Sequence, residues 1–214
     1  MPMSRRSFWL TVGYALVLGL LAPISARAGL VVSATNPTTA AGGSGWFDIL
    51  LTNTDSSSVD VSSFNTAVEV ASNSGLTFTG ANGSIESPNS YIFGSVQPGG
   101  LIASNDGLNL TLTDFLSTGS QPVAAGATVG LAHVLYTLAG NTPVGTPLAI
   151  TFTAGGSQIY DASLNEIIPG VQGGNITVTA AAVPEPGTLV LAGLVSGLGG
   201  VCVYKRRRAG QVVA

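Results

Sequence analysis

The chain has 214 residues, of which 45% are hydrophobic and only 8% are charged, which excludes a disordered polyelectrolyte and fits one folded domain with extra segments at its ends. All seven Lys and Arg residues lie near the two termini, so residues 29–204 contain none, whereas all ten acids fall inside that stretch. Because residues 29–204 contain no Lys or Arg, this part of the chain is not expected to bind the phosphates of nucleic acid or to adhere electrostatically to anionic lipid.

The first 28 residues are predicted to be a signal peptide with a short apolar helix. Two arginines, Arg5 and Arg6, precede an apolar segment at residues 8–21, and small residues follow it. A basic region, an apolar region and an A-x-A site in this order are typical of secretory signals. The paired arginines fit both the general secretory and the twin-arginine routes, and the sequence leaves that choice open. The residues that define the predicted cleavage are Ala26, Ala28 and Gly29.

Residues 29–180 are predicted to form one all-β domain, a jelly-roll β-sandwich of about nine strands. Short apolar or alternating runs recur between clusters of Gly, Pro, Asn and Ser, without helical periodicity of useful length. Many short strands in succession favour two packed sheets. The strands are expected at Leu30–Thr35, Trp46–Asn53, Ser63–Val70, Leu76–Thr79, Ile102–Asn105, Leu108–Thr113, Val129–Leu138, Pro147–Thr153 and Asn175–Ala180.

Alternation assigns faces within two of these strands. In Leu108–Thr113 leucines alternate with polar residues, so one face is expected in the core and the other in water. The same rule points Phe47, Ile49 and Leu51 inward and places Trp46 on the opposite face. An outward-facing tryptophan can stack on a sugar ring, which makes Trp46 a candidate ligand-binding residue.

Three segments in the later part of the chain resemble a cohesin domain. They are Gly126–Leu138, Pro143–Leu148 and Ile159–Val178, which contain in order an alternating strand, a P-x-G-T-x-P-like turn, a D-x-x-x-N-E-I segment and a closing G-x-I-x-V strand. The resemblance implies a nine-stranded jelly-roll sandwich over residues 30–180, although the first strand departs from the pattern. Nothing in the sequence indicates a cellulosome, so the dockerin partner that the resemblance implies is not expected.

His133 is the only histidine, and it lies in the predicted strand Val129–Leu138. Alternation places it on the outer face with Leu131 and Leu135, an apolar patch that is a candidate ligand surface. An ordinary surface histidine is the favoured interpretation, because no nucleophile motif and no H-x-x-x-H or C-x-x-C metal spacing accompanies it.

Paired carboxylates can hydrolyse glycosides, but a mature region with one Trp and no Arg is poorly equipped for that chemistry. The protein is therefore not expected to be an enzyme.

A group of side chains with oxygen atoms is a candidate calcium-binding site. Asp161, Asn165 and Glu166 follow the loop Gly155-Gly156-Ser157 and offer the hard ligands that calcium prefers. Their spacing is not that of an EF-hand, and acidic loops on an exported domain are the favoured explanation. No other metal or cofactor is expected.

The last segment, residues 181–214, has a tripartite order. A Pro-Glu-Pro motif precedes an apolar stretch from Thr188 to Tyr204, and a basic run follows. Seventeen residues at about 1.5 Å each span roughly 25 Å, close to the thickness of a hydrocarbon core. A transmembrane helix is therefore predicted at 188–204, with the basic run as a cytoplasmic stop-transfer signal. The motif residues are Pro184, Glu185 and Pro186, and the basic residues are Lys205, Arg206, Arg207 and Arg208.

This tail resembles the PEP-CTERM sorting domain of exopolysaccharide-producing bacteria. The resemblance implies that an exosortase in the inner membrane recognises Pro184, Glu185 and Pro186 and cuts nearby. Two prolines hold the motif extended and outside the helix, which presents Glu185 to a partner at the membrane surface.

These observations predict a noncatalytic exported protein of the cell surface or extracellular matrix, which passes through an inner-membrane intermediate and contacts the membrane only transiently. Its expected partners are the exosortase and extracellular polysaccharide or matrix proteins. The alternative is a carbohydrate-binding module of the matrix, in which Trp46 stacks on a sugar. The sequence leaves open whether the processed protein is released or stays attached.

Overall fold

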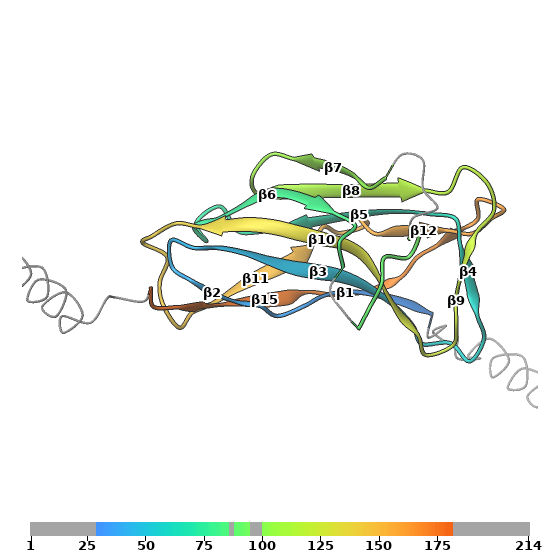
Figure 1. The fold of residues 1–214 in the computed structure, drawn as a ribbon, viewed down its shortest axis with the longest axis horizontal. Coiled ribbons are helices and arrows are strands. Elements are labelled where there is room, and N and C mark those ends of the chain that lie inside the picture. Colours follow the sequence, from blue (N-terminus) through green and yellow to red (C-terminus); the bar gives the residue numbers. More distant parts are fainter. Residues whose placement is uncertain (1–28, 86–87, 95–99, 182–214) are drawn as a thin grey trace, which may run out of the picture.

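The computed structural model describes residues 29–85, 88–94 and 100–181. The predicted signal peptide, the Pro-Glu-Pro motif, the predicted transmembrane helix and the basic tail lie outside the described residues. Within the described ranges, no helix has the length and apolarity needed to cross a membrane. The ends of the described region, near residues 29 and 181, lie at opposite ends of its long axis (Figure 1).

The described chain is an all-β sandwich of two main sheets. One sheet has five strands in the order β14-β1-β3-β10-β6, and the other has the order β13-β12-β5-β11-β15-β2, with β8 beside β5 and β7 beside β8 (Figure 1). A separate ribbon pairs β4 with β9. The strands are β1 Leu30–Ala34, β2 Thr38–Ala40, β3 Ser44–Asn53, β4 Val59–Val61, β5 Ser63–Glu69, β6 Leu76–Asn82, β7 Ile102–Asn105, β8 Asn109–Phe115, β9 Gln121–Val123, β10 Thr128–Leu138, β11 Pro147–Phe152, β12 Gln158–Tyr160, β13 Glu166–Ile167, β14 Gly170–Gln172 and β15 Gly174–Thr179.

All nine predicted strands are present, with their ends shifted by up to three residues. The six strands that were not predicted are β2, β4, β9, β12, β13 and β14, and each is only two or three residues long. Two or three residues are too few to show an alternating pattern. Such a strand is therefore defined by the strand with which it pairs and could not be recognised from its own sequence.

The core lies between the two sheets, and the predicted alternation fills it. Phe47, Ile49 and Leu51 of β3 are fully buried, as predicted, and Leu110 and Leu112 of β8 face them from the other layer with 0% exposure. Burying each such side chain contributes about 1.5–3 kcal/mol relative to leaving it exposed. In a chain with no Lys or Arg from residue 29 to 204, this apolar packing is the main source of stability.

Gly45 lies where the first sheet approaches β2 of the second sheet. Thr39 of β2 and Tyr136 of β10 share a buried hydrogen bond of 2.6 Å between their hydroxyl groups, and burial raises the pKa of the Tyr136 phenol. A Cβ on Gly45 would lie 2.4 Å from the Thr39 hydroxyl oxygen and 2.6 Å from that of Tyr136. A glycine is therefore required here for close approach.

We expect Gly45→Ala to lower the free energy of unfolding by about 1–3 kcal/mol, because the added methyl group overpacks this contact and separates the two hydroxyls. Urea denaturation measures the change. Gly140→Ala is the matched control, since a Cβ on Gly140 would meet nothing within 4 Å. Equal stability of the two variants would show that the Thr39–Tyr136 contact adapts without cost.

Residues 88–94 connect the two sheets at one side of the sandwich. The backbone of Gly130 in β10 pairs with this segment, accepting from the N–H of Ile92 and donating to the carbonyl of Ser90 at 2.9 and 2.8 Å. The Tyr91 hydroxyl donates a hydrogen bond to the carboxylate of Asp114 on β8, a residue that is 1% exposed. Burial, followed by the hydrogen bond to Asp114, raises the pKa of Tyr91 and keeps its hydroxyl protonated as a donor.

We expect Tyr91→Phe to destabilise the sandwich by about 1–3 kcal/mol, because it leaves one oxygen of a buried carboxylate without its hydroxyl donor. Thermal and urea unfolding measure the loss. Tyr160→Phe, a matched change at a half-buried tyrosine, is expected to cost less. If both variants unfold at the same urea concentration, the Tyr91–Asp114 bond contributes nothing measurable.

A candidate ligand-binding site on the outer face of the first sheet

Two neighbouring strands carry the candidate site, β3 and β10. They are antiparallel, and their register places Leu135 directly opposite Trp46 and His133 directly opposite Asp48. Because side chains alternate along a strand, these four residues lie on the face opposite to Phe47 and Ile49, which fill the core. The pairing of two rigid strands thus brings an indole, an imidazole, a carboxylate and a leucine together on one outer surface.

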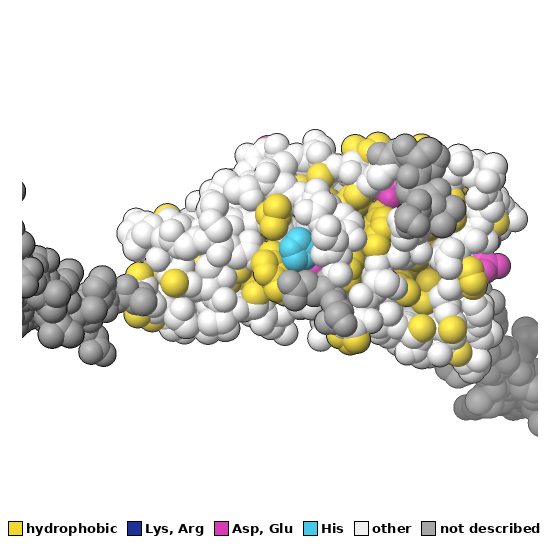
Figure 2. Space-filling model, in the orientation of Figure 1, with side chains coloured by type: hydrophobic (Ala, Val, Ile, Leu, Met, Phe, Trp, Pro, Cys, Tyr) yellow, Lys and Arg dark blue, Asp and Glu magenta, His cyan; other side chains and the backbone are white. Residues whose placement is uncertain are grey.

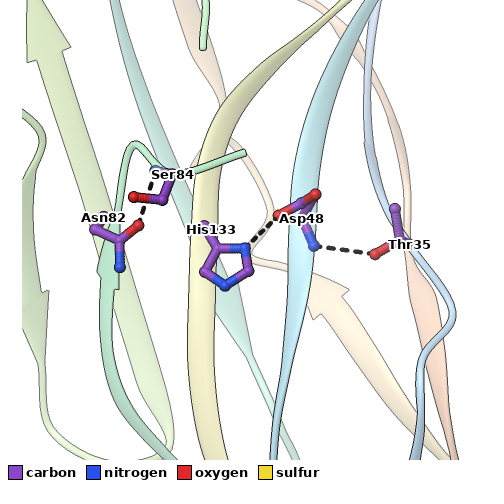
Figure 3. Close-up of polar contacts among 5 residues, drawn as sticks. All are labelled: Thr35, Asp48, Asn82, Ser84 and His133. Carbon is purple, nitrogen blue, oxygen red and sulfur yellow. Dashed lines mark hydrogen bonds and ion pairs between the residues drawn. The ribbon is translucent and has the colours of Figure 1, made fainter. Parts of the chain in front are cut away.

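Asp48 and His133 form a close pair at the centre of this surface. Nδ1 of His133 lies 2.8 Å from Oδ1 of Asp48, and the two residues are only 8% and 4% exposed (Figure 3). The backbone N–H of Asp48 donates to the hydroxyl of Thr35 at 3.0 Å. The Trp46 ring covers the imidazole, with ring centroids 4.8 Å apart and planes tilted by 30°. His133 therefore orients the Asp48 carboxylate, while Thr35 holds the Asp48 backbone.

The structure corrects two expectations for β10. His133 is buried and paired rather than an ordinary surface histidine, because Asp48 and Trp46 enclose it. Leu131 is fully buried rather than part of the outer patch. The register of β10 against β3 shifts between Gly130 and Ala132, and such a bulge interrupts strict alternation so that Leu131 and Ala132 both lose contact with water.

The other two members of the predicted ligand surface are accessible. Trp46 is 38% exposed and Leu135 is 37% exposed. Figure 2 shows the histidine, in cyan, on this face with hydrophobic side chains beside it. The structure thus brings three of the four predicted residues, Trp46, His133 and Leu135, into one cluster and adds Asp48 to it.

A pocket of about 330 Å³ opens beside Trp46 and Asp48. Its other walls come from the segment that follows β1 and from the start of the 88–94 segment. Sequence reasoning missed these residues, because Asn and Pro in connecting loops carry no periodic signal that would place them against β3. The missed lining residues are Thr35, Asn36, Pro37, Pro88 and Asn89.

The Asp48–His133 pair has the geometry of the base in a hydrolytic triad, but the described residues do not complete one. In a triad the second imidazole nitrogen contacts a nucleophilic hydroxyl or thiol. Among the described residues, no Ser, Thr or Cys side chain is hydrogen-bonded to His133. The nearby Ser84 donates its backbone N–H to the side-chain oxygen of Asn82 at 2.8 Å (Figure 3). The arrangement is suited to hold a ligand by stacking and hydrogen bonds.

The candidate calcium residues lie at a different place and form a turn. Asp161 accepts hydrogen bonds from the backbone N–H groups of Ser163 and Asn165 and from the side-chain amide of Asn165, which holds the pKa of its carboxyl below the usual range. Glu166 accepts instead from the side-chain amide of Gln158 at 2.9 Å. In the part of the chain that the structure describes, no group of three His, Cys, Asp or Glu side chains is placed to hold a metal ion. Calcium binding by Asp161, Asn165 and Glu166 stays a prediction without geometric support.

Comparison with known proteins identifies the fold. No protein-family model matches the sequence, and no curated protein matches it. Among solved structures, a type I cohesin–dockerin complex from Clostridium thermocellum matches with a TM-score of 0.54 at 15% identity, covering 73% of this chain and 97% of that one. The seventh ScaB type I cohesin of Pseudobacteroides cellulosolvens matches with 0.53 at 13% identity, covering 73% and 96%.

A non-cellulosomal cohesin of the hyperthermophilic archaeon Archaeoglobus fulgidus matches with a TM-score of 0.51 at 16% identity, covering 72% of this chain and 93% of that one. Identities this low show the fold and nothing finer. The described chain therefore has a cohesin-like β-sandwich, as the resemblance of its later segments implies.

Proposed function

We propose that this protein is a noncatalytic, exported component of the cell surface or extracellular matrix, and that an exosortase processes its C-terminal tail. One observation carries the proposal: a Pro-Glu-Pro motif, an apolar stretch and a basic run follow the sandwich in that order, while a signal-peptide pattern precedes it. The two patterns agree on one topology, with the sandwich outside and the basic residues inside.

The sandwich itself is suited to binding. The one acid–histidine pair among the described residues lies in a stacked, enclosed cluster, and the cohesin fold supports a module that binds other macromolecules. The C. thermocellum relative is a cohesin bound to a dockerin, and a protein partner in the matrix is the corresponding proposal for this chain. Ile102 of β7 and Phe115 of β8 are more than half exposed and lie on one face, which offers such a partner an apolar contact.

Deletion of the exosortase from the native host tests the proposal. The parent strain is expected to yield a shortened protein at the cell surface or in the medium. The deletion strain is expected to keep the full-length tail in the inner membrane, because the basic run stops transfer and nothing cuts the motif. Antibodies against the sandwich and against the basic tail separate the two forms. The same short form in both strains would overturn the assignment to an exosortase.

The second candidate function is a carbohydrate-binding module. The observation that favours it is the half-exposed Trp46 at the edge of a pocket with polar walls. A flat aromatic ring beside hydrogen-bonding groups provides both kinds of contact that a sugar needs, an apolar surface for its C–H groups and partners for its hydroxyls.

A further inference from the structure

We propose that the pocket beside Trp46 and Asp48 binds a single uncharged sugar ring of a matrix polysaccharide and discriminates against acidic polysaccharides. This inference rests on the carbohydrate-binding alternative of the proposed function and names the class of sugar. It follows from the shape of the pocket, from its polar walls and from the charge of the domain.

The volume of the pocket and its aromatic wall indicate that it accommodates a single sugar ring. Its volume of about 330 Å³ is at the lower end of the range for small-molecule sites, roughly 300–1,000 Å³, so it accommodates one ring rather than a long segment. Trp46 lines it and is fixed from beneath by His133, with the ring centroids 4.8 Å apart. The indole is thus a supported platform that is still 38% exposed.

The remaining walls offer directional hydrogen bonds. Asp48 is 4% exposed and lines the pocket, and its carboxylate is a strong acceptor for sugar hydroxyls. Asn36 uses its side-chain oxygen to accept the backbone N–H of Asn175 at 2.7 Å, so its amide nitrogen is the group that serves as a donor. Asn89 and Thr35 add an amide and a hydroxyl to the lining. Acceptors and donors are therefore both present, as a polyhydroxylated ligand requires.

The site is organised before a ligand arrives. Asp48 is held by Nδ1 of His133 and by the hydroxyl of Thr35, which accepts its backbone N–H. Trp46 and Asp48 are on the long strand β3, which pairs on both sides with β1 and β10. A ligand group that meets side chains already fixed loses less affinity to ordering the protein.

The charge of the domain decides the kind of sugar. Residues 29–204 contain no Lys or Arg, so neither of these side chains is available within that stretch to neutralise a uronate or a sulfate. The pocket instead contains the carboxylate of Asp48. An acidic sugar would meet repulsion without compensation, whereas an uncharged ring meets only hydrogen-bonding groups.

Tryptophan fluorescence of the full-length protein in detergent provides the test. The chain has two tryptophans, Trp9 and Trp46, so in a Trp9→Phe background the emission reports on the pocket alone. Titration with uncharged oligosaccharides (β-glucan, galactan, mannan and chitin fragments) is expected to give a saturable change with at least one of them. Alginate and dextran sulfate fragments of the same length are expected to give none.

Calorimetry then compares variants with the uncharged fragment that binds. Trp46→Ala is expected to weaken binding about tenfold or more, as the loss of a central aromatic anchor does. Ile168→Ala is the control for truncation of an exposed hydrophobic residue, because Ile168 is 80% exposed and does not line this pocket, and it is expected to bind as the parent does. Circular dichroism verifies that both variants remain folded.

Three results would overturn the inference: no fluorescence change with any fragment, a preference for the acidic fragments, or equal weakening by Trp46→Ala and Ile168→Ala. None of them bears on export and tail processing, which the exosortase deletion tests separately. Failure of this sugar site is therefore distinguishable from failure of the proposed matrix function.

Discussion

His133→Ala is expected to lower the free energy of unfolding by about 3 kcal/mol, one of the largest effects of any single change outside the apolar core. The substitution removes one partner of Asp48, a residue that is only 4% exposed and whose carboxylate lies 2.8 Å from the imidazole. Taking a hydrogen-bond partner from a buried charge costs more than the pair itself contributes, because the charge has already lost most of its hydration. The substitution also removes the ring beneath Trp46.

Urea denaturation of three variants separates these contributions. Asp48→Asn keeps an oxygen that accepts the imidazole N–H and is expected to lose less stability than His133→Ala. Leu135→Ala, at a residue of β10 that is 37% exposed, controls for truncation on the same strand and is expected to cost about 1 kcal/mol or less. If His133→Ala and Leu135→Ala have the same effect, the Asp48–His133 pair does not stabilise this face.

Replacing Pro184, Glu185 and Pro186 by alanine is expected to abolish maturation, the largest functional effect that the proposal predicts. Proline fixes φ and disfavours helix for the residue before it, so the proposal expects Glu185 to be presented in an extended segment. Three alanines, in contrast, are good helix formers and remove the carboxylate. The full-length protein is expected to accumulate in the inner membrane of the native host, which immunoblots of membrane, surface and medium fractions show directly.

Two further variants separate the contribution of the Glu185 charge from a general effect of changing this segment. Glu185→Gln keeps the size and the extended backbone, so it isolates the contribution of the charge. Val183→Ala changes a neighbouring position outside the motif and outside the predicted range of cleavage, and is expected to mature normally. Normal maturation of the triple variant would contradict recognition of the motif, whatever else happens to the tail.

The strands of the sandwich could be predicted wherever alternation is long enough to be read. In β3, Phe47, Ile49 and Leu51 face the core as expected, and the leucines of β8 do the same. The short strands β12 and β14 could not be predicted, because each is held by pairing with a strand far away in the sequence, as Ile159 pairs with Phe64 and Val171 pairs with Val32. Strand β13 pairs with the nearby β12, but its two residues are too few to show alternation. Such pairing is a property of the assembled sheets.

The candidate site could be predicted only where it depends on alternation within one strand, and not where it depends on pairing between strands. Trp46 was placed correctly on the outer face of β3 because this strand alternates regularly. Leu131 was misplaced because nothing in the sequence distinguishes a regular strand from one with a bulge at Gly130. The Asp48–His133 pair spans 85 residues of sequence, and only the register of β3 against β10 brings these two side chains together.

The predictions for the two termini depend on the sequence alone, whereas the fold of the sandwich is supported by the structure. The signal peptide and the sorting tail are predicted from the order of charge, apolar length and proline, which are local properties. The cohesin-like fold is seen in the structure and in its likeness to solved cohesins. The proposed binding surface depends on both, since composition sets its charge and strand register sets its geometry.

The intact mass of the protein recovered from the medium and envelope of its native host tests the central claim most directly. The account predicts a chain that begins at Gly29 and ends between Pro184 and Gly187, with or without an added glycan or lipid. A mass that still includes Thr188–Arg208 would contradict it, because the tail would then be a permanent anchor rather than a sorting signal.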